Sequence, residues 1–322
     1  MNVIVSFSPL PPEFIVNILN SHGITDIEVI NVHDKPKDDI LMDVSRADII
    51  IGDYTFKHSI DREMIAAMKK VKLIQQPSAG YQHIDIMACK EAQISVANTA
   101  GANAISVAEY TTLAALYLLK NIFFASRTTA KGEWQQMQIR PVELYGKTWG
   151  IVGMGRIGKL LAQRLIVFGV TILYYDPWRL TLETEQLMSV TYVPFYELIK
   201  TSDIISLHCP LTEETKGLIG KEELSTMKSS AIIINVARGE IIDENALADA
   251  LKEGRIAGAA LDVFSDEPIN SNNPLLKVNS DRLLLTPHVA GVSIESQMRI
   301  INLTIENIIA VISGREPVNI IV

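Results

Sequence analysis

The feature that most constrains how this chain can fold is a glycine-rich turn set between an apolar strand and a helix. Residues 153–158 read GMGRIG; they follow the apolar stretch 149–152 directly and open a helical stretch. In such a unit Gly153 permits a tight turn, Gly155 lets a ligand approach the backbone, and Gly158 lets the helix pack on the sheet. The spacing alone arises often by chance, so its place between strand and helix is what predicts a nucleotide-binding unit.

An acidic residue stands where this kind of unit binds the ribose of a dinucleotide. Asp176 ends the next apolar strand, 18 residues beyond Gly158. Its carboxylate can accept hydrogen bonds from the ribose hydroxyls and would repel a 2′-phosphate, so we expect NAD, with NADP less favoured. Arg179 lies close enough to weaken this preference. A strand–turn–helix that needs glycine for packing alone is the competing interpretation.

Strand-like and helix-like stretches alternate on both sides of the turn. Before it, we expect strands at 2–6, 27–32, 47–52 and 71–75 and helices at 13–20, 64–70 and 86–92. From the turn onward, we expect strands at 148–152, 170–175, 204–207, 231–235, 256–261 and 282–285 and helices at 156–168, 221–227 and 244–253. Alternation of this kind predicts an α/β fold of two doubly wound parallel-sheet domains, a Rossmann domain and a flavodoxin-like domain.

Two long helices separate and follow these series. Residues 103–126 lack glycine and proline and predict one continuous helix, with Ser106 and Glu109 as a capping box, followed by a polar stretch at 127–141. A last helix is expected at 293–313 with Gly314 as its C-cap. We expect that helix to return to the first domain. The predicted domains are therefore 1–100 plus 290–322, which would hold substrate, and 101–289, which would bind NAD.

Charge and cysteine content exclude several classes of partner. The chain has 322 residues, a net charge of −8 and two cysteines. The acidic balance gives no reason to expect nucleic acid or an anionic membrane as a partner. Two cysteines are too few for a disulfide framework, and no apolar run reaches the roughly 18 residues that span a bilayer. With no signal peptide at the N-terminus, we expect a cytoplasmic protein.

Three residues near the end of the chain supply what reduction of a 2-oxo acid requires. Arg238 lies in NVARG, Glu267 in LDVFSDEP and His288 in LTPHVAG. Arginine offers a rigid fork for a carboxylate, and histidine can donate a proton to a carbonyl oxygen near neutral pH. A carboxylate beside that histidine favours its protonated form. We therefore expect Arg238, Glu267 and His288 to be catalytic.

Their positions support this interpretation, because each follows a predicted strand and ligands bind beyond the carboxyl ends of strands in open α/β sheets. Any one of the three, taken alone, would be read as an ordinary loop residue. Among the other histidines, we expect His22, His33 and His58 on the surface, His83 in a substrate loop and His208 along the cofactor cleft. No cluster has metal-ligand spacing, so no metal is expected.

Over nearly its whole length the sequence resembles the D-isomer-specific 2-hydroxyacid dehydrogenases. The motifs that carry the resemblance are SAGYQHID at 78–85, NTAG at 98–101, SVAE at 106–109, GMGRIG at 153–158, HCPLT at 208–212, NVARG at 235–239, LDVFSDEP at 261–268 and TPHVAG at 286–291. The resemblance implies that Arg238 binds substrate, Glu267 tunes His288, and His288 is the acid/base. It also implies a homodimer that contacts through the cofactor domains.

The resemblance extends the list of binding residues. It implies that the backbone of Ser78, Ala79 and Gly80 receives the substrate carboxylate, together with Arg238 and His288, and that Asp262 holds the nicotinamide carboxamide. The full cofactor set expected is Gly153, Gly155, Arg156, Ile157, Gly158, Asp176, His208, Cys209, Pro210, Val236, Ala237, Arg238, Asp262, His288 and Gly291.

The loops of the first domain should select the substrate's third substituent. The candidate segments are 8–10, 54–58 and 75–78, which offer aromatic and amide groups with one lysine, Lys57. We expect a small or apolar substituent and no phosphate. The alternative function is an NAD-sensing regulator or corepressor of the same fold, since fold alone does not decide activity.

Overall fold

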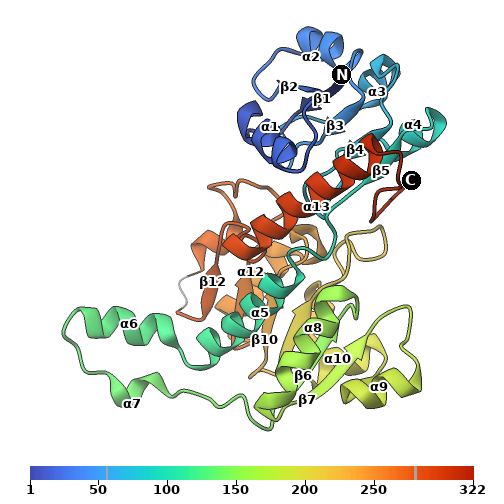
Figure 1. Cartoon of the computed structure of the whole chain (residues 1–322). Coiled ribbons are helices and arrows are strands. Elements are labelled where there is room, and N and C mark those ends of the chain that lie inside the picture. Colours follow the sequence, from blue (N-terminus) through green and yellow to red (C-terminus); the bar gives the residue numbers. More distant parts are fainter. Residues whose placement is uncertain (56, 279–280) are drawn as a thin grey trace. The chain divides into compact units, whose positions relative to one another are not determined.

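The computed structural model describes residues 1–55, 57–278 and 281–322 of the chain (Figure 1). These residues form two compact units. Unit 1 comprises Met1–Asn103 with Ile294–Val322, and unit 2 comprises Ala104–Ser293. Unit 1 is thus discontinuous in sequence. Within the described residues, no helix has both the length and the apolar character needed to cross a membrane.

Unit 1 is built on a parallel sheet in the order β2-β1-β3-β4-β5, which is the flavodoxin-like order. The strands are β1 (Asn2–Ser6), β2 (Ile27–Asn31), β3 (Ile49–Ile51), β4 (Leu73–Gln75) and β5 (Ser95–Ala97). The helices are α1 (Pro12–Ser21), α2 (Lys37–Val44), α3 (Arg62–Ala67), α4 (Ile86–Glu91) and α13 (Ile294–Ile312). Ile305 and Ile308 of α13 share a buried cluster with Ile4, Ile49 and Leu73 of the sheet, so the last helix covers one sheet face.

Unit 2 is built on a parallel sheet in the order β12-β11-β10-β9-β6-β7-β8. The strand order reverses between β6 and β9, as at the nucleotide-binding switch point of a Rossmann sheet. The strands are β6 (Thr148–Val152), β7 (Thr171–Tyr175), β8 (Val190–Tyr192), β9 (Ile204–Leu207), β10 (Ile232–Asn235), β11 (Gly258–Leu261) and β12 (Leu283–Leu285). Two doubly wound parallel sheets confirm the predicted fold class.

Helices cover both faces of this second sheet. The α-helices are α5 (Ala104–Leu119), α6 (Ile122–Ala130), α7 (Gln136–Ile139), α8 (Arg156–Leu165), α9 (Leu182–Met188), α10 (Phe195–Thr201), α11 (Lys221–Thr226) and α12 (Glu244–Lys252), and the 3-10 helices are η1 (Ile166–Phe168), η2 (Gly239–Ile241) and η3 (Pro274–Lys277). Trp149 packs with α5 and α8 on one face, and Ile233 packs with α10, α11 and α12 on the other. Burial on both faces explains why the strands are continuous apolar runs.

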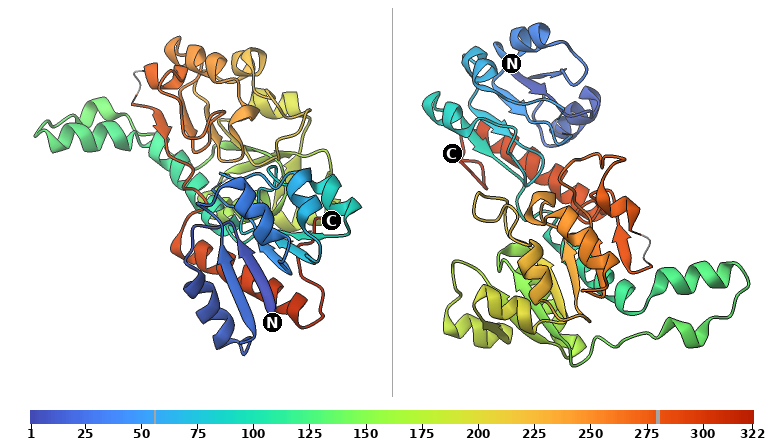
Figure 2. Two further views of the ribbon diagram at one scale, coloured as in Figure 1. Left: turned by 90° about the horizontal axis from the view of Figure 1, so that it is seen from above. Right: turned by 180° about the vertical axis from the view of Figure 1, so that it is seen from behind.

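Helices α6 and α7 project from the rest of unit 2 as an arm, which is clear in each of the views (Figures 1 and 2). The prediction of one helix over 103–126 was therefore wrong. The chain breaks between α5 and α6 at Asn121, whose φ of 51° is left-handed and ends the regular helix. The predicted capping box is absent as well: Ser106 lies inside α5 and donates its hydroxyl hydrogen to the Ala290 carbonyl at 2.7 Å.

Candidate active site

The glycine turn forms a tight cradle between β6 and α8. Gly153 has φ +97°, and a Cβ there would lie 2.6 Å from the Cys209 amide nitrogen. A Cβ at Gly158 would collide with the Gly153 carbonyl oxygen, whereas a Cβ at Gly155 would meet no atom within 4 Å. The first and third glycines thus serve packing, and the second faces open space beside the N-terminus of α8. This arrangement fits a dinucleotide pyrophosphate, with Arg156 and Ile157 opening the helix.

Asp176 follows β7 and ties two backbone segments together. Its Oδ2 accepts a hydrogen bond from the Met154 amide at 2.8 Å, and its Oδ1 accepts one from the Trp178 amide at 2.9 Å. The predicted ribose carboxylate therefore lies beside the glycine cradle. Arg179, the residue that left the choice between NAD and NADP open, is paired with Glu185 of α9.

The loop after β9 lies against the cradle and carries His208, Cys209 and Pro210. His208 Nε2 lies 3.0 Å from the Ser206 hydroxyl, and its buried Nδ1 has no hydrogen-bond partner in the described structure. Burial lowers the pKa of His208 to about 3 and raises the pKa of Cys209 to about 11. Both side chains are therefore uncharged at neutral pH.

Glu267 and His288 form a hydrogen-bonded pair at the carboxyl end of the same sheet. The Glu267 Oε2 lies 2.7 Å from the His288 Nδ1, and about half of the His288 side chain (47%) is exposed. Burial alone would raise the pKa of Glu267, but hydrogen bonds from His288 and from the Phe264 amide outweigh it and lower that pKa. The carboxylate is thus ionised at neutral pH and fixes the ring, leaving the other ring nitrogen directed away from the pair.

Arg238 follows β10 and is partly buried. One guanidinium nitrogen donates to the Ala237 carbonyl at 2.6 Å, and the described residues provide no acceptor for the others. Burial lowers the pKa of Arg238, and the charge of Glu267 opposes that shift. The next residue, Gly239, packs on the backbone of Phe264 and Ser265 so closely that any side chain would collide. The arginine loop and the glutamate loop are therefore in direct contact.

Two acidic residues, Asp262 and Glu244, hold these loops in place by accepting hydrogen bonds from them. Asp262 is 1% exposed and accepts hydrogen bonds from the Thr286 hydroxyl at 2.6 Å and from the Val289 and Ala290 amides at 2.8 Å. Glu244 accepts from the Ser265 amide at 2.9 Å and from Asn273 at 2.7 Å. Sequence reasoning did not find Glu244 at all, because an acidic residue at the start of a helix is typical of any helix.

In unit 1, the segment that contains Ser78, Ala79 and Gly80 is held by its carbonyl groups. The Ser78 carbonyl accepts from the Thr99 amide at 3.2 Å, and the Ala79 carbonyl accepts from Asn98 at 2.9 Å. Across the described chain, the amides of these three residues donate to no protein acceptor. Three adjacent free amides can receive a carboxylate.

The expectation that His33 and His58 are simply surface residues was wrong. Both are partly buried, and the His58 Nε2 lies 2.6 Å from the His33 carbonyl oxygen while the His33 Nδ1 lies 2.9 Å from that of Phe7. They join the loops after β1, β2 and β3. Residue 56, in one of the predicted pocket segments, lies outside the described residues. Nowhere in 1–55, 57–278 or 281–322 do three or more His, Cys, Asp or Glu form a metal-binding group.

A Rossmann sheet with this cradle and a carboxylate–imidazole pair at its carboxyl edge defines a nicotinamide-dependent dehydrogenase. Residues 112–290 match the sequence family "D-isomer specific 2-hydroxyacid dehydrogenase, NAD binding domain". A glyoxylate reductase of Korarchaeum cryptofilum is 41% identical over 266 residues, which cover 81% of this chain and 79% of that protein.

Solved structures of similar proteins match this chain over nearly its full length. A glyoxylate reductase from Paecilomyes thermophila has a TM-score of 0.88 at 30% identity and covers 99% of this chain and 98% of its own. A D-lactate dehydrogenase of Aquifex aeolicus, solved with NAD and lactic acid, has a TM-score of 0.83 at 29% identity and covers 97% and 96%. The chain belongs to the D-isomer specific 2-hydroxyacid dehydrogenase family, and it is an NAD-dependent enzyme of that family.

Proposed function

We propose that the enzyme interconverts a small 2-oxo acid and the D-2-hydroxy acid, with His288 as the acid/base. The observation that carries this proposal is the 2.7 Å pair between Glu267 and His288, one loop away from a partly buried Arg238. When bound, NADH supplies the hydride to the carbonyl carbon. His288 donates a proton to the carbonyl oxygen, and in the reverse direction it takes the proton from the hydroxyl.

Each neighbour of His288 has a distinct part in this scheme. The Glu267 carboxylate stabilises the protonated imidazole and holds the Nδ1 side of the ring, so the proton leaves from Nε2. Arg238 offers its unpaired N–H groups to the substrate, where they bind the carboxylate and stabilise charge that develops on the carbonyl oxygen. We also propose that the free amides of Ser78, Ala79 and Gly80 in unit 1 bind the substrate carboxylate.

We assign the cofactor to the domain formed by residues 101–289 and the substrate loops to 1–100 plus 290–322. The cradle residues Gly153, Gly155, Arg156, Ile157 and Gly158 hold the pyrophosphate, and Asp176 binds the adenosine ribose. The remaining contacts come from the loops after β9, β10, β11 and β12, through His208, Cys209, Pro210, Val236, Ala237, Arg238, Asp262, His288 and Gly291. The protein is proposed to act as a cytoplasmic homodimer.

A small substrate without a phosphate agrees best with the loops of unit 1. Lys57, the cation in the predicted pocket segments, pairs with Asp34 at 2.7 Å, so its charge already has a partner. The Korarchaeum relative is a glyoxylate reductase, and glyoxylate has the smallest third substituent a 2-oxo acid can have. We therefore place glyoxylate and similarly small 2-oxo acids first.

The test is a spectrophotometric assay of NADH oxidation with a panel of 2-oxo acids. We expect turnover of glyoxylate, hydroxypyruvate or pyruvate, and we expect His288→Ala to lower kcat by roughly 10²–10⁴, the usual value of general acid–base catalysis. The loss arises because no proton donor then faces the carbonyl oxygen.

His22→Ala is the matched control, since His22 is an exposed imidazole directly after the end of α1. Undiminished turnover in His288→Ala would remove the assigned acid/base, a strong preference for a phosphorylated 2-oxo acid would remove the substrate class, and turnover of no 2-oxo acid would favour a nucleotide-sensing role.

A further inference from the structure

We propose that Glu185 enforces the preference for NAD over NADP by holding Arg179 away from the position of a ribose 2′-phosphate. The inference rests on the assignment of NAD to the β6–β7 half of the sheet, and it is independent of the acid/base role of His288. It makes Glu185 a positioning residue for cofactor choice, because it acts through Arg179.

Arg179 lies in the segment that would surround the adenosine ribose. It comes three residues after Asp176, whose carboxylate accepts from the Met154 amide of the glycine cradle at 2.8 Å. A 2′-phosphate bound beside Asp176 would need a cation close at hand. An arginine in this loop is suited to that task, since its planar fork matches phosphate oxygens.

In the structure, the guanidinium of Arg179 is bound by Glu185. Arg179 Nε donates to Glu185 Oε1 at 2.9 Å and Arg179 Nη2 donates to Glu185 Oε2 at 3.0 Å, which is a two-point pair. The guanidinium also lies 5.0 Å from the centre of the Tyr192 ring. Two hydrogen bonds and a ring contact fix its orientation toward α9 and β8.

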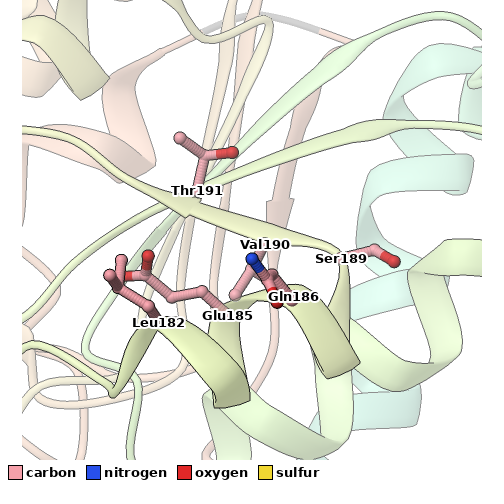
Figure 3. Close-up of a pocket in the computed structure, with 6 residues that line it drawn as sticks. All are labelled: Leu182, Glu185, Gln186, Ser189, Val190 and Thr191. Carbon is pink, nitrogen blue, oxygen red and sulfur yellow. The ribbon is translucent and has the colours of Figure 1, made fainter.

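Glu185 is itself held firmly. Its side chain is 9% exposed, and its Oε1 also accepts from the Tyr174 hydroxyl at 2.7 Å. Hydrogen bonds from Arg179 and Tyr174 lower the pKa of Glu185, so it remains a carboxylate at neutral pH. Figure 3 shows Glu185 and Gln186 on α9 beside Val190 and Thr191 of β8, where they line an open pocket.

The charges around the expected position of the adenosine ribose then favour NAD over NADP. Asp176 and Glu185 are two carboxylates, and Arg179 neutralises the second. A 2′-phosphate would face the Asp176 charge without a free guanidinium, whereas a 2′-hydroxyl needs an acceptor and no cation. The Glu185–Arg179 pair therefore removes the one feature of the loop that had left the cofactor choice open.

A purely structural role for Glu185 makes a different prediction. The Tyr174 hydroxyl also accepts from the Leu180 amide at 2.9 Å, so Glu185 contributes to holding the loop. Loss of that support would weaken binding of both cofactors by a similar factor. Loss of the proposed restraint would improve binding of NADP⁺ relative to NAD⁺.

The experiment measures the dissociation constants of NAD⁺ and NADP⁺ by calorimetry in the absence of any 2-oxo acid. We expect Glu185→Gln, in an Asp176→Ser background, to improve NADP⁺ affinity relative to NAD⁺ by about tenfold, the order of one charge-assisted pair. Glutamine keeps the size of the side chain and an acceptor for Tyr174. The gain should vanish when Arg179→Ala is added.

Two further variants test whether Arg179 is withheld from the phosphate in the parent protein and whether the position of the removed charge matters. Arg179→Ala alone should change NADP⁺ affinity by less than about twofold, because the parent protein does not present Arg179 to the phosphate. Glu183→Gln removes the same charge from an exposed position of α9 and should leave the NADP⁺/NAD⁺ ratio unchanged.

An equal effect of Glu185→Gln on both cofactors, or a gain that survives Arg179→Ala, would overturn the proposal. So would a large loss of NADP⁺ affinity in Arg179→Ala alone. Because no substrate is present, each of these outcomes leaves the proposed reaction untouched.

Discussion

Two imidazoles of unit 2 lie in opposite environments, and the difference decides what each can do. His288 pairs with Glu267 and is about half exposed. His208 has no acidic partner, and burial lowers its pKa to about 3. A histidine that stays neutral at physiological pH cannot donate the proton that carbonyl reduction needs. Under the proposed mechanism, His288 would carry out the chemistry and His208 would only line the cofactor site.

The depressed pKa of His208 predicts a pH-dependent stability. In the unfolded chain the imidazole takes up a proton near pH 6.5, whereas in the folded state it does so only near pH 3. The contribution is therefore fully present above pH 6.5 and falls as the pH is lowered, by at most about 1.4 kcal/mol for each pH unit. Urea unfolding at pH 7.5 and 5.5 should show a smaller pH effect in His208→Gln than in the parent protein.

His22→Gln is the control for that measurement, because it removes an exposed imidazole. It should reproduce the parent's pH dependence. Identical slopes in the parent and His208→Gln would mean that His208 is protonated as easily in the folded state as in the unfolded chain.

At the scale of the element, the glycines of the cradle have different roles: Gly158 is needed for packing, and Gly155 is expected to matter for cofactor binding. Gly158→Ala places a methyl group against the Gly153 carbonyl, and we expect it to lower the free energy of unfolding by about 1–3 kcal/mol, as overpacking does. Gly155→Ala meets no protein atom, so its stability should remain that of the parent. Its NAD affinity should fall by about tenfold or more, because the methyl group occupies the approach of the pyrophosphate. Thermal unfolding and calorimetry with NAD⁺ check the two effects separately.

The strands of both sheets could be predicted to within two residues at each end wherever they were long and apolar, as β6 and β7 show. The short elements β8 and α9 gave no clear pattern, because β8 has only three residues and α9 only seven. The helix break at Asn121 was also invisible, since a left-handed residue leaves no mark on the hydrophobic period. Among the site residues, Arg238, Glu267 and His288 stood out through local motifs, whereas Glu244 acts through contacts between loops distant in sequence.

At the scale of the whole molecule, the arm of α6 and α7 bears on the proposed homodimer. Trp134, between α6 and α7, is 84% exposed, and Met137 of α7 is 81% exposed. Large apolar side chains gathered on a projecting segment mark an interaction surface. We expect light scattering after gel filtration to give the mass of a dimer, and the double variant Trp134→Glu/Met137→Glu to shift it toward monomer.

Leu187→Glu is the control for the arm, since Leu187 is 84% exposed but lies on α9. It should leave the mass unchanged. A monomeric parent protein, or a dimer that tolerates both glutamates on the arm, would contradict the proposed homodimer.

The sequence discontinuity of unit 1 has a consequence for biosynthesis. Its five strands leave the ribosome first, but α13, whose Ile305 and Ile308 cover Ile4, Ile49 and Leu73, emerges only after all of unit 2. At synthesis rates of about 5–20 residues per second, that sheet face waits roughly ten seconds or longer for its cover. Unit 2 is therefore fully synthesised while the nascent unit 1 still presents an apolar surface, and we expect unit 1 to be the part of the nascent chain most exposed to aggregation or chaperone binding.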